Sequence, residues 1–250
     1  MNTIDLNADL GEGYSTDEAL LGIITTASIA CGGHAGDDDT MRACARVARE
    51  KGVIIGAHPG FPDRENFGRV RIDMDPDDIA YEVVDQVERL IVNAGREGAN
   101  VRFVKLHGAL ANMAAEDEDL ARTVYAAVRD HHPNFGVLAI DGTAQVPAAE
   151  SLQMKLVSEA YADRAYDRKG MLVPRTEAGA VLIKRKDVLA RCLLLAKRGE
   201  ILSREGRVFE SSARSICIHG DTKGAVALVQ GIRDTLEAEG LTVESAFAQA

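Results

Sequence analysis

The chain has 250 residues, of which 46% are apolar and 27% are charged, an ordinary globular composition with enough length for one large core. Its formal net charge of −10 argues against nucleic acid or an anionic membrane as the main partner, so an anionic substrate needs locally placed Lys or Arg. No apolar run approaches the roughly 18–20 residues that span a bilayer, and residues 1–9 lack a signal-peptide core, so we expect a cytoplasmic protein.

Short apolar or β-branched runs recur along the chain and predict seven strands, with helical periodicity between most of them. Seven strand–helix units average roughly 36 residues each, the scale of a βα repeat in a barrel. Because the strands are almost continuously apolar, we expect a parallel sheet that is covered on both faces. The predicted strands are 3–7, 27–31, 53–57, 101–106, 136–140, 154–158 and 215–218.

Helix boundaries are indicated by capping residues, prolines and glycines. The predicted boundaries are a capping box of Ser15 with Glu18, a helix from Asp37 to Gly52, a helix with Asp75 as N-cap and Pro76 at its first position, and a last helix from about Asp221 to Glu239.

Every predicted strand delivers an ionisable residue at or just beyond its C-terminal end. In an open doubly wound sheet, the rival architecture, only the strands beside the switch point need such residues. In a closed barrel all strand ends meet at one mouth. The pattern therefore favours a single (β/α)-barrel domain, residues 1–250, with about seven parallel strands. These residues are Asp9, His34, His58, Lys105 with His107, Asp141, Glu159, and His219 with Asp221.

Two strand ends carry the densest polar chemistry. Lys105 and His107 are two residues apart, so their side chains point to the same side of an extended chain, and a buried lysine there needs a charged partner. Asn7, Asp9 and Glu12 lie in the glycine-loosened segment "NADLGEG", where they offer acceptors to a cation or to substrate N–H groups. A solvated lysine and an Asx-type turn are the simpler explanations of the two segments.

The histidines at strand ends admit two interpretations. Asp9, His34 and His58 together are candidates to ligate a divalent cation that activates water, if a metal is bound. Each histidine taken alone is equally consistent with a hydrogen-bonded core residue. His131 and His132, at the end of a helix, are expected to do no more than interact with the helix dipole.

Two further segments can bind an anion. Asp221 begins a predicted helix in "HGDTKG", where free N–H groups suit an anion, although a plain N-cap explains it as well. Arg164 lies in a charged, loop-rich segment and is a candidate to clamp a carboxylate, with a solvated lid as the alternative.

Several classes of protein are excluded by missing motifs. The sequence has no G-x-x-x-x-G-K-[ST] loop, no G-x-S-x-G elbow and no H-E-x-x-H. The four cysteines have no CxxC spacing, and we expect buried reduced thiols.

Six ordered blocks of the sequence resemble those of the LamB/YcsF family, from about residue 4 to about residue 225. They are "DLNADLGEG", "IACGGHAGD", "GAHPGFPDRENFGR", "VKLHGAL", "EAYADRAYDRKGMLVPR" and "CIHGD". The resemblance implies a barrel related to those of glycoside hydrolases and deacetylases. It also implies the A subunit of an ATP-dependent 5-oxoprolinase, which cleaves the lactam of 5-oxo-L-proline to L-glutamate with two further subunits, B and C. ATP, with Mg²⁺, is then expected to be handled together with those subunits.

For that reaction we assign Asp9, Lys105 and His107 to catalysis. Asp9 or His107 serves as general base, and Lys105 or a backbone N–H stabilises the developing oxyanion. Residues expected to bind substrate are Asn7, Glu12, Glu159, Arg164, His219 and Asp221.

The chain departs from the family pattern where Gly33 replaces Phe and Ala111 replaces Tyr, and we expect both changes to enlarge or reshape the mouth. Two other functions remain open. One is a stand-alone metal-dependent amide or sugar deacetylase, and the other is a non-catalytic subunit that only binds the substrate.

Overall fold

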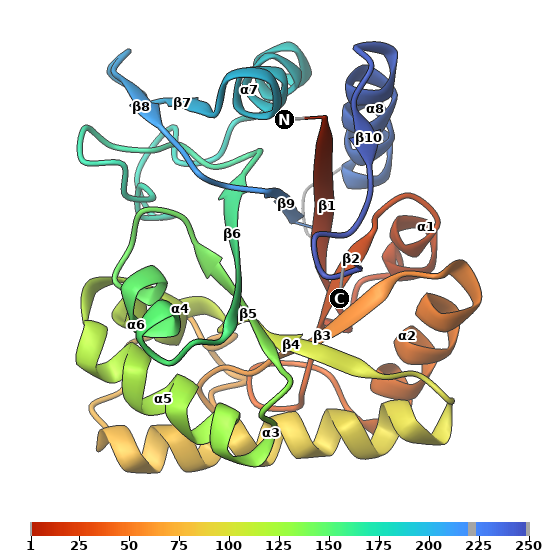
Figure 1. The fold of residues 1–250 in the computed structure, drawn as a ribbon, viewed down its shortest axis with the longest axis vertical. Coiled ribbons are helices and arrows are strands. Elements are labelled where there is room, and N and C mark those ends of the chain that lie inside the picture. The colour runs from red at the N-terminus through yellow and green to blue at the C-terminus, as the bar shows by residue number, and fades with distance from the viewer. Residues whose placement is uncertain (1, 220–223, 249–250) are drawn as a thin grey trace.

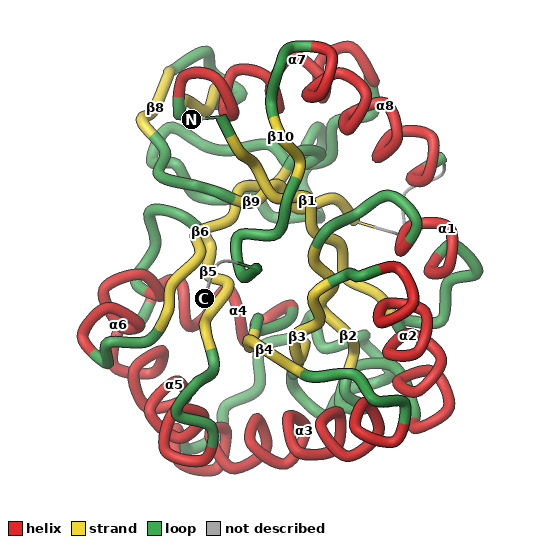
Figure 2. Tube along the Cα trace, turned by 45° about the vertical axis from the view of Figure 1, so that its right-hand side comes forward, coloured by secondary structure: helices red, strands yellow, loops and turns green. Residues whose placement is uncertain are grey.

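Seven parallel strands form a closed barrel in the computed structural model, which describes residues 2–219 and 224–248, with the backbone alone for His219. The last strand of the ring, β9, pairs with both β6 and β1, and this double pairing closes the sheet. In Figure 2 the strands form the inner ring and the helices lie outside it. The barrel strands are β1 (Thr3–Leu10), β2 (Thr26–Ala30), β3 (Ile54–His58), β4 (Val101–Val104), β5 (Gly136–Ile140), β6 (Lys155–Tyr161) and β9 (Ser215–His219).

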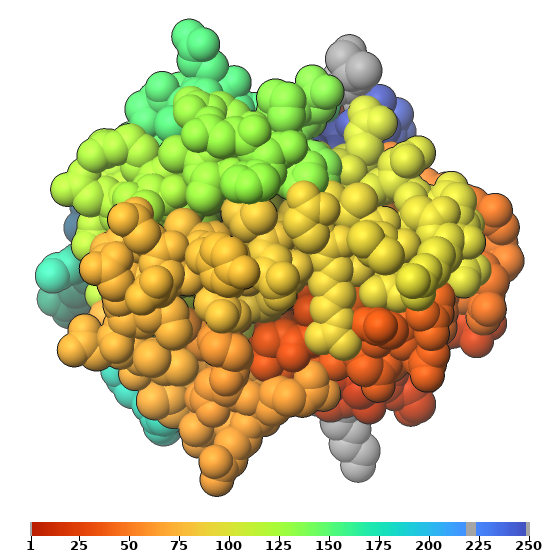
Figure 3. Space-filling model, turned by 90° about the horizontal axis from the view of Figure 1, so that it is seen from below, coloured from red at the N-terminus to blue at the C-terminus, as the bar shows by residue number. Residues whose placement is uncertain are grey.

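Eight helices among the described residues surround this ring (Figure 1). Seen from below, the long helix α3 runs across the outer face, and α5 packs beside it (Figure 3). The helices are α1 (Asp17–Leu21), α2 (Asp38–Lys51), α3 (Pro76–Arg96), α4 (Gly108–Glu116), α5 (Glu118–His131), α6 (Gln145–Ser151), α7 (Arg185–Arg198) and α8 (Ala225–Ala238).

All seven predicted strands are confirmed, with ends that differ by at most three residues. The open-sheet alternative is wrong, because β9 joins both edges of the sheet. Asp37 caps α2 in a reciprocal capping box with Thr40, and Asp75 caps α3 ahead of Pro76, as predicted. The Ser15 capping box is wrong, since the five-residue α1 has Thr16 at its N-cap with no side-chain cap. The last helix begins at Ala225, and Asp221 lies outside the described residues.

Two elements are absent from the prediction. One is the antiparallel pair β7 (Glu200–Leu202) and β8 (Val208–Glu210). The other is the C-terminal segment, in which β10 (Thr242–Val243) pairs with the N-terminal end of β1. Phe247 then stacks on Phe103, with ring centroids 4.4 Å apart. This segment therefore covers the N-terminal ends of the strands and leaves the C-terminal ends for a site.

The four cysteines are buried and reduced, as expected. Among the residues that the structure describes, no helix is both long and apolar enough to cross a membrane.

Candidate active site

A column of polar side chains begins deep inside the barrel at Asp5. Alternation along β1 directs Asp5, Asn7 and Asp9 to the inside of the barrel. The Asp5 carboxyl accepts hydrogen bonds from the hydroxyls of Thr25, at 2.5 Å, and Thr26, at 2.7 Å, and from the hydroxyl of Ser215. These three donors come from the β2 region and β9, so the base of the column ties three segments of the barrel together.

Asn7 connects this base to the next layer. Its side-chain Nδ2 donates to Ser215 Oγ at 2.7 Å and to Glu159 Oε2 at 3.1 Å. Its Oδ1 accepts from Lys105 Nζ at 3.3 Å. Because donors and acceptor of this amide are all engaged, Asn7 orients Glu159 and Lys105.

Lys105 is buried, with 2% of its surface exposed, and has two carboxylates as partners. Its Nζ lies 2.9 Å from Asp9 Oδ1 and 3.0 Å from Glu159 Oε2, and it donates to Cys217 Sγ at 3.2 Å. Burial disfavours the ammonium charge, but Asp9, Cys217 and Glu159 outweigh this and raise the pKa of Lys105 well above its ordinary value. Lys105 is therefore a fixed cation near the strand ends.

Backbone carbonyls fix the tautomers of two buried histidines. His58 Nδ1 lies 2.9 Å from the carbonyl oxygen of Lys105, and His107 Nε2 lies 2.9 Å from that of Phe67. A carbonyl oxygen only accepts, so both of these ring nitrogens carry hydrogen. In the neutral rings the other two nitrogens, His58 Nε2 and His107 Nδ1, then carry lone pairs. These two atoms are 3.0 Å apart, so two lone pairs face each other.

Glu12 and His34 complete this group. Glu12 Oε1 lies 3.3 Å from His34 Nε2, 3.6 Å from His107 Nδ1 and 3.9 Å from His58 Nε2. The rings of His34 and His107 are stacked, with centroids 3.5 Å apart and 4° between their planes. Glu12, His34, His58 and His107 each offer a ligand atom, and these atoms lie within 4.8 Å of one another. We call this set the histidine cluster.

Burial changes the pKa of all three imidazoles in the histidine cluster. Burial lowers the pKa of His34 and that of His107 to about 4, the latter with a contribution from His34. Burial also lowers the pKa of His58 well below its ordinary value. All three rings are therefore neutral near pH 7, which is the form that ligates metals or accepts a proton.

Close backbone packing holds the cluster in place. A Cβ on Gly68 would lie 2.8 Å from His34 Cβ, and one on Gly60 would lie 3.1 Å from His34 Nδ1. Phe67 has a left-handed backbone, with φ of 57°, and its ring meets those of His34 and His107 edge-on. That conformation costs a non-glycine residue about 1 kcal/mol or more. The loop after β3 thus accepts backbone strain that directs the Phe67 carbonyl at His107.

Eight of the residues predicted for the site come together here: Asn7, Asp9, Glu12, His34, His58, Lys105, His107 and Glu159. Asp9 Oδ2 lies 3.4 Å from His58 Nε2 and joins the lysine to the histidine cluster. Asp221 and the side chain of His219 lie outside the described residues.

Two predicted residues bond elsewhere. Arg164 is buried and donates from Nη2 to the Val173 carbonyl oxygen at 2.6 Å, so it orders the segment after β6. The Arg164 Nε has no hydrogen-bond partner among the described residues. Asp141 accepts from the hydroxyls of Ser211 and Ser212, both at 2.6 Å, and so holds the segment before β9.

The sequence missed two contributors to the site. Cys217, predicted only as a buried thiol, contacts the Lys105 ammonium, and burial raises its pKa well above the ordinary value. Tyr161 places its ring 5.4 Å from Lys105 Nζ. Strand alternation was the available signal, because Cys217 and Ser215 lie on the same face of β9, and Glu159 and Tyr161 on the same face of β6.

Gly33 does not enlarge the mouth in the way expected. A Cβ there would lie 2.4 Å from Gln86 Oε1, so the Gln86 amide occupies the position of a side chain at 33. That amide is fixed by hydrogen bonds with both the N–H and the carbonyl of Gly60. The absence of a side chain at Gly33 therefore leaves room for the Gln86 amide, which holds the loop after β3 in place.

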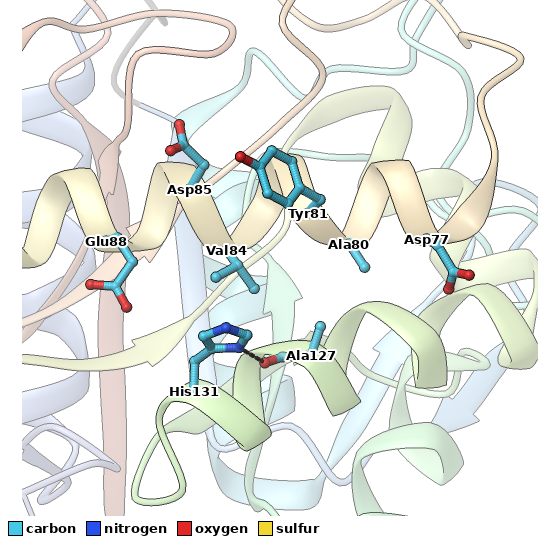
Figure 4. A pocket seen from close by; sticks show the side chains of 8 residues that line it. All are labelled: Asp77, Ala80, Tyr81, Val84, Asp85, Glu88, Ala127 and His131. Atoms are coloured by element: carbon cyan, nitrogen blue, oxygen red, sulfur yellow. Dashed lines mark hydrogen bonds between the residues drawn. The ribbon is translucent and has the colours of Figure 1, made fainter.

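A separate groove lies on the outer surface between α3 and α5 (Figure 4). His131 lines it, with Nδ1 bonded to the Ala127 carbonyl oxygen at 2.9 Å, alongside Tyr81 and Glu88. His132 lies 3.0 Å from Glu88. Since helices alone line this groove, it has no part in the polar column of the barrel.

The chain matches known proteins along almost its whole length. The model of the LamB/YcsF family matches residues 4–250. A lactam utilization protein from Thermus thermophilus superposes with a TM-score of 0.90 and 32% identity, covering 97% of this chain and 99% of the other.

More distant structures share the fold. A putative cellobiose-phosphate cleavage protein from Enterococcus faecalis has a TM-score of 0.58 at 12% identity, covering 98% of this chain and 97% of the other. A family 4 carbohydrate esterase from Streptomyces lividans has a TM-score of 0.52 at 11% identity, covering 97% and 91%. The relation to glycoside hydrolase and deacetylase barrels is thus confirmed for the fold. With a family match from residue 4 to residue 250, this chain belongs to the LamB/YcsF family.

Proposed function

We propose that this chain is the lactam-cleaving A subunit of an ATP-dependent 5-oxoprolinase, which opens 5-oxo-L-proline to L-glutamate in the cytoplasm. The observation that carries the substrate class is the similarity to a lactam utilization protein over 97% of this chain and 99% of that one. ATP, with Mg²⁺, acts through the complete enzyme, together with two partner subunits, B and C.

The lactam is a poor electrophile, and transfer of phosphate from ATP to its oxygen would give an activated, imidate-like species. Water then attacks the ring carbon, a base takes its proton, and the C=N electron pair moves to the ring nitrogen, which is protonated. The ring C–N bond breaks and leaves an acyl phosphate, and attack of a second water on its carbonyl releases phosphate and gives L-glutamate.

We assign the role of the base to Asp9. Both of its oxygens have neighbours, Lys105 at 2.9 Å and His58 at 3.4 Å, but each carboxylate oxygen has a second lone pair for water. Each ring nitrogen of His107 has a single position, and these face the Phe67 carbonyl and His58. The Lys105 ammonium, 2.9 Å from Asp9 Oδ1, stabilises the oxyanion that develops when water attacks the carbonyl of the acyl phosphate, a contribution typically worth about 3 kcal/mol per donor.

Two buried polar atoms without hydrogen-bond partners among the described residues are assigned to substrate binding, one in the column and one in the segment after β6. Glu159 Oε1 is buried and has no hydrogen-bond partner among the described residues, so it is suited to accept from the lactam N–H. The unpartnered Nε of Arg164 is assigned to the substrate carboxylate. Asn7 positions Glu159, and Glu12, His219 and Asp221 complete the proposed binding residues.

The test is release of glutamate from 5-oxo-L-proline, with and without ATP, by this chain alone and with both partner subunits. We expect activity only with ATP and all three chains. Asp9→Asn should lower kcat by at least about 100-fold, whereas His131→Ala, on the outer surface, should leave it unchanged. Near wild-type turnover by Asp9→Asn and by His107→Ala would refute the assignment.

A stand-alone hydrolase is the second candidate, and the cluster of neutral histidines favours it. It predicts ATP-independent cleavage of amides or acetylated sugars by this chain alone. A third alternative, a subunit that only binds substrate, predicts tight 5-oxo-L-proline binding and full activity after substitution of Asp9 and His107.

A further inference from the structure

The starting observation is an unfavourable contact inside a well-packed site. His58 Nε2 and His107 Nδ1 lie 3.0 Å apart with their lone pairs facing, since each ring gives its only hydrogen to a backbone carbonyl. Glu12 Oε1 adds a third acceptor, 3.6 Å from His107 Nδ1 and 3.9 Å from His58 Nε2. Three electron-rich atoms that converge on one point repel one another unless a positive charge lies between them.

The second observation is the spacing of these atoms. Ligands at about 2.0–2.1 Å from a tetrahedral metal ion lie about 3.3 Å from one another. Four of the six distances between ligand atoms of the histidine cluster are 3.0, 3.3, 3.6 and 3.9 Å, which bracket this value, and all six lie within 4.8 Å. A backbone carbonyl on the far nitrogen of a histidine is also the usual way in which a metal-binding imidazole is oriented.

We infer that Glu12, His34, His58 and His107 bind one divalent cation of the Zn²⁺ class. Three imidazoles and one carboxylate suit Zn²⁺, Co²⁺ or Ni²⁺, whereas Mg²⁺ and Ca²⁺ prefer oxygen ligands alone. Asp9, which the sequence suggested as a ligand, is engaged by Lys105 through Oδ1 and lies beside the cluster. The inference rests on geometry and does not depend on the proposed function.

The four ligands are not equivalent. His58 and His107 are held by carbonyls in the tautomer that directs a lone pair into the cluster. His34 Nδ1 is buried without a hydrogen-bond partner among the described residues, so no group of this kind fixes the tautomer of His34. Substitution of His34 should therefore weaken binding less than substitution of His58 or His107. A bound cation of this class would polarise a carbonyl or lower the pKa of a bound water.

The experiment is a titration of the chelator-stripped chain, without partners or substrate, with Co²⁺ followed by visible absorption and with Zn²⁺ by calorimetry. We expect one equivalent per chain, a spectrum of a four- or five-coordinate Co²⁺ site, and displacement of Co²⁺ by Zn²⁺ but not by excess Mg²⁺. Glu12→Gln and His107→Gln should each weaken Co²⁺ binding at least about tenfold. The control is the double variant His131→Ala, His132→Ala, which should bind Co²⁺ as the wild type does.

Circular dichroism and the melting temperature of each stripped variant separate loss of the site from loss of the fold. If Glu12→Gln or His107→Gln fails to fold, His34→Gln replaces it, with a smaller loss of affinity expected. The inference is overturned by the absence of stoichiometric Co²⁺ binding, by variants that bind Co²⁺ like the wild type, or by loss of binding in the surface control. Because no lactam or ATP is used, these outcomes are independent of the glutamate assay.

Discussion

The inside of the barrel holds two polar groups that are built differently. Around Asp5, three hydroxyls donate to one carboxyl, and Asn7 uses both amide atoms. At the mouth, two lone pairs face each other, and His34 Nδ1 and Glu159 Oε1 lack partners among the described residues. A buried polar network that satisfies itself holds strands together, whereas one that does not is prepared for a ligand.

Lys105 joins the two groups, and its removal should have the largest effect. Lys105→Met leaves Asp9 and Glu159 buried without their cation, which we expect to cost about 3–5 kcal/mol of unfolding free energy and to abolish activity. Urea unfolding measures the loss. Adding Glu159→Gln to this variant removes one unpaired charge and should restore part of the stability. A loss below about 1 kcal/mol would mean that the ammonium does not hold the column together.

The pH dependence of stability tests the hydrogen-bonded network around Asp5. Burial raises its pKa from 3.8 to about 6, against the hydrogen bonds from Ser215, Thr25 and Thr26 that lower it. The folded chain therefore holds this proton more tightly than the unfolded chain. The resulting stability is fully present below about pH 4 and is lost as the pH rises through 6, an effect of about 2–3 kcal/mol.

Asp5→Asn should remove this dependence of the unfolding free energy on pH. The stability of the variant relative to the wild type therefore improves from pH 4 to pH 7. Urea unfolding at intervals across this range checks it. A constant difference between the two proteins would show that the carboxyl does not change its protonation there.

Alanine substitutions at two glycines with similar φ angles separate the cost of backbone strain from the cost of a steric contact with His34 at the mouth. Gly68 and Gly52 have φ of 62° and 70°, but only at Gly68 would a Cβ meet His34, at 2.8 Å. Gly52→Ala should cost about 1 kcal/mol for the backbone alone. Gly68→Ala should cost about 1 kcal/mol more and should also weaken Co²⁺ binding. Equal losses, with unchanged Co²⁺ affinity, would mean that His34 moves freely.

The smallest effect is expected at the surface. His132 lies 3.0 Å from Glu88, whose side chain is 46% exposed, so His132→Ala should change the unfolding free energy by less than about 1 kcal/mol. Thermal melting with and without Zn²⁺ measures this. A change in the shift of melting temperature that Zn²⁺ causes would place the bound metal on the helix surface and not in the barrel.

The barrel was predictable because its strands are apolar runs and each ends in an ionisable residue. The β7–β8 pair was not, since its three-residue strands carry Glu200 and Glu210 and have no apolar period. The covering of the barrel by Phe247 depends on stacking with Phe103, which no local pattern encodes.

The members of the site were likewise predictable from the strand ends, but their pairing was not. Asp9 and Glu12 are three residues apart, and only the fold directs Asp9 to Lys105 and Glu12 to the histidines. The tautomers of His58 and His107 depend on carbonyls of Lys105 and Phe67, from other segments of the chain. The roles therefore follow from tertiary contacts that have no sequence signature.

The most direct test of the contrast between the network around Asp5 and the histidines at the mouth is to determine the tautomers of His58 and His107. Long-range ¹H–¹⁵N spectra of the metal-free chain at neutral pH report which imidazole nitrogens carry hydrogen. We predict neutral rings with hydrogen on Nδ1 of His58 and on Nε2 of His107, which leaves the lone pairs of the other nitrogens facing each other. Hydrogen on His58 Nε2 or on His107 Nδ1 would contradict this account, because a hydrogen bond would then join the two rings and the mouth would need no cation.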